Sequence, residues 1–332
     1  MRLIAGDVGG TKTYLALYER ASGGSFTEVQ TARYDSPAFH GLGPMVRVFL
    51  GAETKSVSRA AFGVAGPVVD DRCKATNLPW TIDARVLEAD LGIERVTLLN
   101  DFQAIALAMS HVPASDLVVL SEREVEPAGP VAIIGAGTGL GEAILLPAGD
   151  GRPARVLASE GGHTDFAPRD ETEMELLKFL LRRHKRVSYE RVLSGPGLVT
   201  LYEFVIAHGL APERGETRIR MQDTDPAQVI GESALAGSDP ACERAVDIFV
   251  SLYGAEAGNL ALKVLPFGGL FVAGGIAAKL LPKMRSGLFM ESFVHKGRMS
   301  GLLEGMRVAI VTNPRVGLLG ARAAALAAAA RQ

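Results

Sequence analysis

The sequence predicts an α/β protein of two lobes with a cleft between them. The chain has 332 residues, which is too long for one compact hydrophobic core. A glycine-rich turn between two apolar, strand-like segments occurs twice, in residues 3–18 and 131–146. A repeat at so long an interval suits two lobes of related topology better than a solenoid. Because ligands bind in clefts, we expect the functional site there.

Composition and charge exclude several classes of protein. The 35 Lys and Arg residues against 37 Asp and Glu residues leave a formal charge of -2, which gives no field to attract nucleic acid or an anionic membrane. Cys73 and Cys242 are too few and too far apart for a disulfide framework or a cysteine-rich zinc site. No apolar run reaches the ~20 residues that span a bilayer, and Asp7 interrupts any signal peptide. We expect a cytoplasmic protein that binds neither nucleic acid nor membrane.

The first half of the chain contains two informative local patterns. Residues 3–18 predict a strand, a tight turn and a second strand, so we expect the chain to start in its core with no leading domain. Residues 94–109 predict a strand that ends at Asn100 and Asp101, followed by a helix. These two polar residues are therefore expected at the carboxyl end of a strand.

The second half adds a further glycine turn and several helices. Residues 131–146 repeat the pattern of strand, glycine turn and strand. Residues 170–184 predict a helix, with acids at its start and bases at its end. Residues 269–281 indicate a buried strand, a Gly-Gly turn and a helix, and residues 320–331 an alanine-rich helix.

Both glycine turns have the composition of phosphate-binding loops. Where no Cβ atoms intervene, successive backbone N–H groups can converge on phosphate oxygens. The first turn also supplies a carboxylate, Asp7, and a hydroxyl, Thr11. Two such loops can hold a triphosphate, although a tight hairpin also uses glycine for its turn alone. The other residues concerned are Gly6, Gly9, Gly10, Gly137, Thr138 and Gly139.

Two other phosphate-binding motifs do not fit these turns. The first turn lacks the glycine that precedes lysine in a P-loop, here Lys12. Both turns are followed by strand-like sequence, whereas a P-loop or a Rossmann turn must open a helix. Hydride transfer and Walker-type ATPases are therefore disfavoured.

Five motifs follow one another along the chain: Gly6-Asp-Val-Gly-Gly-Thr, Leu99-Asn-Asp-Phe, Gly135-Ala-Gly-Thr-Gly-Leu-Gly, Ser159-Glu-Gly-Gly-His and Glu190-Arg-Val-Leu-Ser-Gly-Pro-Gly-Leu. In this order they resemble the bacterial glucokinases, which belong to the superfamily of hexokinase, actin and Hsp70. The similarity continues through Val272-Ala-Gly-Gly to Asn313-Pro-Arg-Val-Gly-Leu-Leu-Gly, so it covers nearly the whole chain.

This resemblance implies a particular architecture. The fold would be the two-lobed, actin-like ATPase (ribonuclease H-like) fold with a cleft between the lobes. Residues 1–112 and 315–332 would form the small lobe, and residues 113–314 the large lobe. The resemblance also implies a homodimer.

A related group of repressors and kinases differs at one segment. That group follows its Glu-x-Gly-His segment with a cysteine-rich zinc motif. Here His163 is followed by Thr-Asp-Phe-Ala-Pro, and no cysteine occurs between His163 and Cys242. No helix-turn-helix region is expected ahead of the first strand either. The sequence therefore favours the branch without zinc.

The resemblance assigns a role to each motif. Asp101 would be the catalytic base that accepts the proton of a sugar hydroxyl, and Asp7 would face Mg²⁺ through water. From the residues alone, Asp101 could instead cap a helix that begins at Phe102. Each of the candidate sugar-binding residues could likewise be an ordinary surface group. The sugar would contact Asn100, Asp101, Glu160, His163 and Glu190. ATP would contact Gly6, Asp7, Val8, Gly9, Gly10, Thr11, Gly137, Thr138, Gly139, Gly274 and Gly275.

The implied function is the ATP-dependent phosphorylation of D-glucose at its 6-hydroxyl to glucose 6-phosphate, the entry to glycolysis, with Mg²⁺ as cofactor. One alternative is a kinase for another hexose or an amino sugar, since a few hydrogen bonds to one hydroxyl decide that choice. A second alternative is a sugar-binding sensor or nucleotide switch that has lost the reaction. The sequence leaves open whether ATP, ADP or polyphosphate is the donor.

Overall fold

The computed structural model describes residues 1–21, 25–51, 57–149 and 152–329 and divides into two compact units. The first unit comprises Met1–Asp116, Val156–Ala158 and Asn313–Gln332. The second comprises Leu117–Arg155 and Ser159–Thr312. The lobe boundaries expected from the sequence remain a prediction.

The first unit is built on a five-stranded sheet with the order β3-β2-β1-β4-β8. The strands β3, β2 and β1 are antiparallel, and β1, β4 and β8 are parallel. A small sheet of β5, β6 and β7 is separate. The strands are β1 (Arg2–Val8), β2 (Lys12–Arg20), β3 (Phe26–Asp35), β4 (Val57–Val64), β5 (Val68–Val69), β6 (Arg72–Lys74), β7 (Thr81–Asp83) and β8 (Arg95–Asn100). The helices are η1 (Ser36–Ala38), α1 (Leu42–Leu50), α2 (Ala84–Leu91), α3 (Asp101–Ala108), η3 (Met109–His111), η4 (Ala114–Asp116) and α13 (Val316–Ala329).

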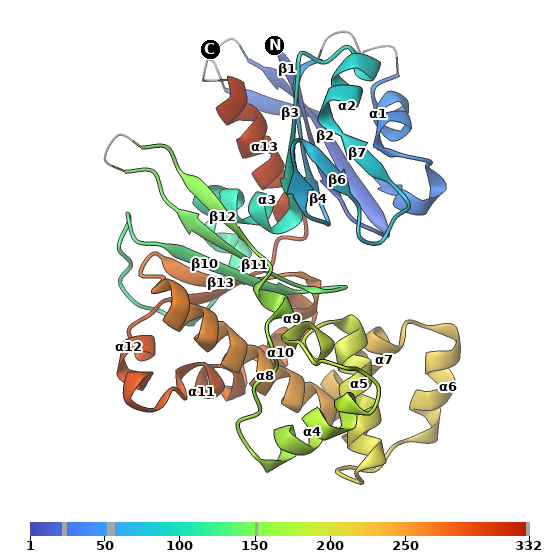
Figure 1. Ribbon diagram of the computed structural model, residues 1–332, viewed down its shortest axis with the longest axis vertical. Helices are drawn as coiled ribbons and strands as arrows, with labels where there is room; N and C mark the ends of the chain where they lie inside the picture. The colour runs from blue at the N-terminus through green and yellow to red at the C-terminus, as the bar shows by residue number, and fades with distance from the viewer. Residues whose placement is uncertain (22–24, 52–56, 150–151, 330–332) are drawn as a thin grey trace. The chain divides into compact units, whose positions relative to one another are not determined.

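Alternation along β1 directs its side chains to opposite faces of this sheet. Leu3 and Ala5 are fully buried in a cluster with residues of α13. Ile4 and Val8 are buried in the cluster that contains α1 and α2. In Figure 1, α13 accordingly lies on one side of the strands and α1 and α2 on the other. The sheet is thus covered on both faces, as an apolar strand such as β1 requires.

Glycines allow close packing around α3. A Cβ built on Gly320 of α13 would lie 1.6 Å from the carbonyl oxygen of Ala104, and one built on Gly63 of β4 would lie 2.9 Å from the Cβ of Ala104. Such distances leave no room for a methyl group. The position of α3, which begins with Asp101, is therefore set by close contacts with a glycine on each of two sides.

Gly320→Ala is expected to destabilise the protein despite alanine's higher helix propensity. The added methyl group must displace α3 or α13, and overpacking of this kind costs about 1–3 kcal/mol. A urea titration should show a lower unfolding midpoint. Gly301→Ala, at an exposed helical position with no atom within 4 Å of the added Cβ, is the matched control and should leave the midpoint unchanged or raise it. An unchanged midpoint for Gly320→Ala would contradict the packing.

The second unit repeats the sheet pattern of the first. Its six-stranded sheet has the order β12-β11-β10-β13-β14-β9. As in the first unit, a glycine-turn hairpin, β10 and β11, is followed across the sheet by two parallel strands, β13 and β14. The strands are β9 (Leu117–Ser121), β10 (Val131–Ala136), β11 (Leu140–Leu146), β12 (Arg155–Ser159), β13 (Gly269–Ala273) and β14 (Val308–Val311).

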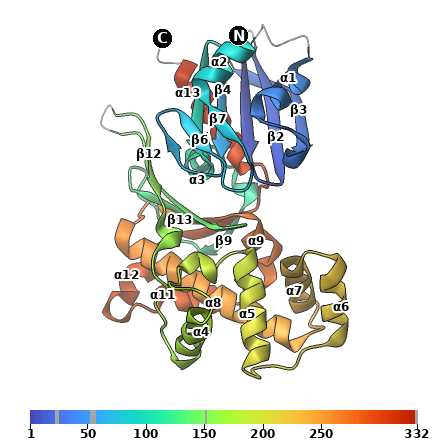
Figure 2. The same ribbon diagram turned by 45° about the vertical axis from the view of Figure 1, so that its right-hand side comes forward.

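Most of the second unit is helical, and α8 packs against α5, α7 and α11, which lie around it in Figure 2. Its largest core cluster joins α8 to β10, β13, α5, α7 and α11. The helices are η5 (Gly161–His163), α4 (Glu171–Leu181), η6 (Tyr189–Arg191), α5 (Gly195–Ala207), α6 (Gly215–Asp223), α7 (Pro226–Leu235), α8 (Pro240–Val264), α9 (Gly275–Lys279), α10 (Leu281–Met284), α11 (Leu288–Val294), η7 (Gly297–Met299) and α12 (Ser300–Glu304).

The secondary structure confirms both glycine hairpins, the strand before Asn100 and the strand before Gly274. Two predicted helix starts were wrong. The helix expected from Phe102 begins at Asp101, because Asn100 rather than Asp101 supplies the cap. The alanine-rich helix begins four residues before Gly320, at Val316, and its predicted last residues fall outside the described range. Among the described residues, no helix is both long and apolar enough to cross a membrane.

Candidate functional site

The turn of the β1–β2 hairpin is fixed by backbone and hydroxyl contacts. The amide of Gly9 donates to the carbonyl of Lys12 at 3.1 Å. The Oγ of Ser36 donates to the carbonyl of Gly9 at 2.7 Å, and the amide of Ser36 to the carbonyl of Thr11 at 3.0 Å. The side chain of Thr11 remains exposed. A hydroxyl on a rigid, glycine-rich turn is suited to donate to a phosphate oxygen.

Asp7 ends the apolar part of β1 and lies next to this turn. Its partner on the adjacent parallel strand, β4, is Gly63. Because Gly63 has no side chain, the start of α3 can lie close to it: a Cβ on Gly63 would be 3.8 Å from the Cα of Asp101. Loss of hydration, and secondly the negative charge of Asp101, raise the pKa of Asp7 to about 7. The two carboxyls are therefore near enough to repel each other, and a cation would relieve that repulsion.

Asn100 and Asp101 lie where the carboxyl end of β8 becomes α3. The Oδ1 of Asn100 accepts from the amides of Phe102 at 2.9 Å and Gln103 at 3.4 Å, which completes a capping box with Gln103. Its Nδ2 donates to the carbonyl of Gly66 at 3.2 Å. The helix cap is thus provided by Asn100, and Asp101 is the first helical residue, half-buried, with Oδ1 accepting from the amide of Phe102 at 2.9 Å.

The residues around Asp7 fit Mg²⁺ better than a fully protein-bound metal. No group of three or more His, Cys, Asp or Glu side chains able to hold a metal ion occurs in the described part of the chain. Mg²⁺ usually keeps several waters and takes one or two carboxylates together with substrate phosphates. The pair of Asp7 and Asp101, beside a glycine-rich turn, offers that donor set.

In the second unit, the β10–β11 turn carries the second candidate phosphate loop. The amide of Gly137 donates to the carbonyl of Gly139 at 2.8 Å, and the amide of Gly195 to the carbonyl of Gly137 at 2.8 Å. Thr138 is exposed at the tip. Gly274 lies against the end of β10, where a Cβ would come within 2.5 Å of the carbonyl oxygen of Ala136. Its φ of 86° also favours glycine.

The three candidate sugar residues of this unit lie together. The Nδ1 of His163 is 3.9 Å from Oε1 of Glu190, and its Nε2 is 3.9 Å from Oε2 of Glu160. Glu160 and His163 are more than half exposed, and Glu190 is one-third exposed. The Oε2 of Glu190 accepts from the amide of Leu140 at 3.0 Å. Two carboxylates and an imidazole thus form one solvent-exposed polar cluster, which can hydrogen-bond several hydroxyls of a sugar.

Each unit brings together its own share of the predicted residues. In the first unit these are Asp7, the Gly9–Thr11 turn residues, Asn100 and Asp101. In the second they are the Gly137–Gly139 turn residues, Gly274, and the group of Glu160, His163 and Glu190.

The sequence interpretation missed two neighbours of these groups. A Cβ on Gly317 would lie 2.7 Å from Oδ2 of Asp7, and a Cβ on Gly161 would lie 1.8 Å from Oε2 of Glu142. In the sequence, Gly317 gave only a weak indication of this role, as a glycine near a helix start. Nothing in the sequence marked Glu142 as a neighbour of the site.

Comparisons with known proteins point to one family. A sequence model described as Glucokinase matches residues 4–328. A glucokinase of Nostoc punctiforme is 43% identical over 333 residues, which covers 96% of this chain and 97% of that protein. Among solved structures, a glucokinase from an Antarctic psychrotroph has a TM-score of 0.81 at 28% identity and covers 98% of this chain and 99% of its own. A ROK family glucokinase from Streptomyces griseus, in complex with glucose and AMPPNP, has a TM-score of 0.65 at 21% identity, with 98% of this chain and 100% of that chain covered.

Proposed function

The chain belongs to the glucokinase family and has its two-lobed, actin-like ATPase fold, and on this premise we propose that it transfers the γ-phosphoryl group of ATP to the 6-hydroxyl of D-glucose. The observation that carries the proposal is the proximity of Asp7 and Asp101 at the carboxyl edge of the parallel strands, next to a glycine-rich turn. Phosphoryl transfer to a hydroxyl requires a cation at the phosphates and a base for the hydroxyl proton. One carboxyl can hold the cation and the other can accept the proton.

In this proposal Asp101 is the general base. It accepts the proton of the sugar hydroxyl as that oxygen attacks phosphorus, so the hydroxyl gains nucleophilic character without free alkoxide. The carboxyl is held by the backbone amide of Phe102 and by the tight packing of α3. Asn100 hydrogen-bonds the sugar with the Nδ2 hydrogen that Gly66 does not take.

The remaining residues bind and orient the substrates. Glu160, His163 and Glu190 hydrogen-bond sugar hydroxyls through their exposed polar atoms. Thr11 and Thr138 donate to phosphate oxygens from the two glycine turns, together with the amides around Gly9 and Gly137. Gly274 and Gly275 border the adenosine. That the Streptomyces griseus relative was solved with glucose and AMPPNP supports both ligands.

Asp7 is the residue we assign to Mg²⁺, through water. When bound, the cation neutralises phosphate charge and orients the phosphates. Asp7 supplies a carboxyl for this purpose, at the end of a largely buried strand. Its raised pKa means that binding of the cation displaces a proton at neutral pH.

A coupled assay for ADP tests the proposed function directly. We expect ADP to form with ATP and Mg²⁺ only when sugar is added, and kcat/KM to be higher for glucose than for mannose, fructose or N-acetylglucosamine. A higher kcat/KM for one of the others would make the protein a kinase for that sugar. Glucose binding without turnover would make it a sensor.

Glu160→Gln is expected to raise the KM for glucose by about tenfold or more, with little change in the KM for ATP. The charged acceptor becomes a neutral amide, and hydrogen bonds to charged groups are the stronger ones. Steady-state kinetics with each substrate varied in turn measures both values. Glu124→Gln, at an exposed loop position, is the control. A rise confined to ATP would remove Glu160 from the sugar site.

We also propose, from the family resemblance, a cytoplasmic homodimer. Light scattering after size exclusion should then give twice the 35.0 kDa of one chain. A mass of one chain at assay concentrations would exclude the dimer.

A further inference from the structure

A buried carboxyl lies directly beneath the turn that carries Glu160 and His163, two of the candidate sugar-binding residues. Glu142, on β11, is only 2% exposed. A Cβ on Gly161 would lie 1.8 Å from its Oε2 and 2.6 Å from its Cδ, so the carboxyl touches the backbone of Gly161. Gly161 stands between Glu160 and His163 in the sequence. The carboxyl of Glu142 thus occupies the place where any other side chain at position 161 would go.

The start of β11 also contacts Glu190, the third candidate sugar-binding residue of this unit. The amide of Leu140 donates to Glu190 at 3.0 Å, and a Cβ on Gly162 would lie 2.1 Å from the carbonyl oxygen of Leu140. Leu140 and Glu142 therefore form one platform, against which both sugar-binding turns are placed.

Glu142 shares its surroundings with a second buried carboxyl, Glu256 of α8, which is fully buried. The two differ in their partners. The Nδ2 of Asn259 donates to Oε2 of Glu256 at 2.8 Å, and the Nζ of Lys263 lies 3.9 Å from its Oε1. Neither the Oε1 of Glu142 nor the Oε1 of Glu256 has a hydrogen-bond partner among the described residues, so the contacts with Asn259 and Lys263 are what distinguish Glu256. Burial raises the pKa of both carboxyls, but Asn259, Lys263 and Lys296 offset this at Glu256, whereas Lys263 alone offsets it at Glu142.

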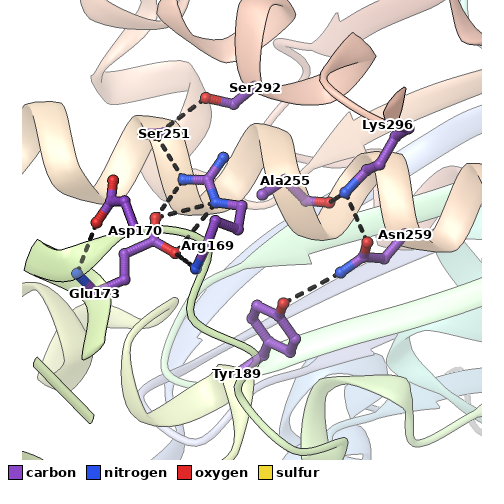
Figure 3. Close-up of polar contacts among 9 residues, drawn as sticks. All are labelled: Arg169, Asp170, Glu173, Tyr189, Ser251, Ala255, Asn259, Ser292 and Lys296. Carbon is purple, nitrogen blue, oxygen red and sulfur yellow. Dashed lines mark hydrogen bonds and ion pairs between the residues drawn. The ribbon is translucent and has the colours of Figure 1, made fainter. Parts of the chain in front are cut away.

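A network of polar contacts connects Glu256 to the second sugar-binding turn. Besides Glu256, the Nδ2 of Asn259 donates to the Oη of Tyr189 at 3.1 Å, and the Oδ1 of Asn259 accepts from the Nζ of Lys296 at 2.6 Å. Figure 3 shows these contacts around Asn259. Tyr189 precedes Glu190 in the chain. Glu256 is thus linked to the turn of Glu190, while Glu142 touches the turn of Glu160 and His163.

We propose that Glu142 is a positioning residue for the sugar site: its buried carboxyl fills the space beneath Gly161 and holds the turn that presents Glu160 and His163. This inference rests on the proposed function, because it gives that turn its role in sugar binding. Glu142 itself touches no substrate in this proposal.

The proposal predicts a dependence of sugar affinity on pH. Burial, and secondly the charge of Glu256, raise the pKa of Glu142 to about 7, whereas Lys263 lowers it. Above that pH the carboxyl loses its proton and becomes a buried charge without a hydrogen-bond donor, so the turn must move to hydrate it. The charged or titratable groups facing the acid pair are Lys263, Lys296, Tyr189 and Tyr253.

Calorimetric titration of the intact protein with glucose, without nucleotide, tests the proposal. For the wild type we expect the Kd to rise about fivefold or more between about pH 6 and about pH 8.5. Glu142→Gln, which keeps shape and neutrality, should match the wild-type Kd at the lower pH and show a flatter profile. Glu142→Ala, which leaves a void, should weaken binding about tenfold at both. The rest of the sequence is the same in all three proteins, so the difference between their profiles reports position 142.

Three outcomes would overturn the positioning role. These are a Glu142→Gln profile as steep as the wild type's, a Glu142→Gln variant that binds glucose poorly at the lower pH, and a folded Glu142→Ala variant with wild-type affinity. A wild type that binds no glucose would instead overturn the proposed function, so the two failures are distinguishable.

Discussion

Asp101→Asn is expected to lower kcat by at least about 10²-fold, the loss typical of removing a general base. An amide cannot accept the hydroxyl proton, although it has nearly the same shape and can still accept the hydrogen bond from the amide of Phe102. The helix cap is untouched, because Asn100 provides it. The melting temperature should therefore change little. Steady-state kinetics and a thermal melt on the same preparation measure the two quantities.

The control for this variant is Asp90→Asn, on the exposed surface of α2. It makes the same chemical change away from both glycine turns and should leave kcat unaltered. Near-normal turnover of Asp101→Asn would refute the assignment of the base. A large loss of melting temperature would show instead that the carboxyl is structural.

Asp7→Asn is expected to lower kcat by about 10²-fold or more at any practical Mg²⁺ concentration, and to make the ligand-free protein more stable. The two effects have one cause. The carboxyl is held in a place that reduces its hydration and lies near Asp101, which suits a bound cation and disfavours a bare charge. With chelator present, the variant should melt about 2 °C or more above the wild type at about pH 8.

The sign of this stability effect follows from the direction of the pKa shift. Asp7 has a pKa of about 7 in the folded protein against an ordinary value of 3.8. Below the ordinary value the carboxyl is protonated in both states, so it does not affect unfolding. As the pH rises toward 7 the unfolded state loses its proton first, and the wild type loses stability relative to the variant. Equal melting temperatures of the two proteins at about pH 8 would contradict the strained environment of Asp7.

Much of the fold could be predicted because its signals are local. Each glycine hairpin combines apolar strands with a turn that only small residues allow, and β8 ends its apolar run at a polar pair. The helix starts were predicted less well. Asn and Asp are equally good caps, so the sequence could not decide between Asn100 and Asp101. The start of α13 was missed because Gly317 and Gly320 lower helix propensity, and tertiary packing against Asp7 and Ala104 overrides that preference.

By itself, the sequence determined the two glycine hairpins, the polar pair that follows β8, and the motifs that place the chain in its family, since these depend on residue identity at short spacing. Only the tertiary structure decided that Asp7 lies near Asp101, that His163 lies between Glu160 and Glu190, and that Glu142 lies beneath Gly161. Each of these joins residues from different strands or turns. Charge repulsion, loss of hydration and steric exclusion act through space, so no pattern along the chain records them.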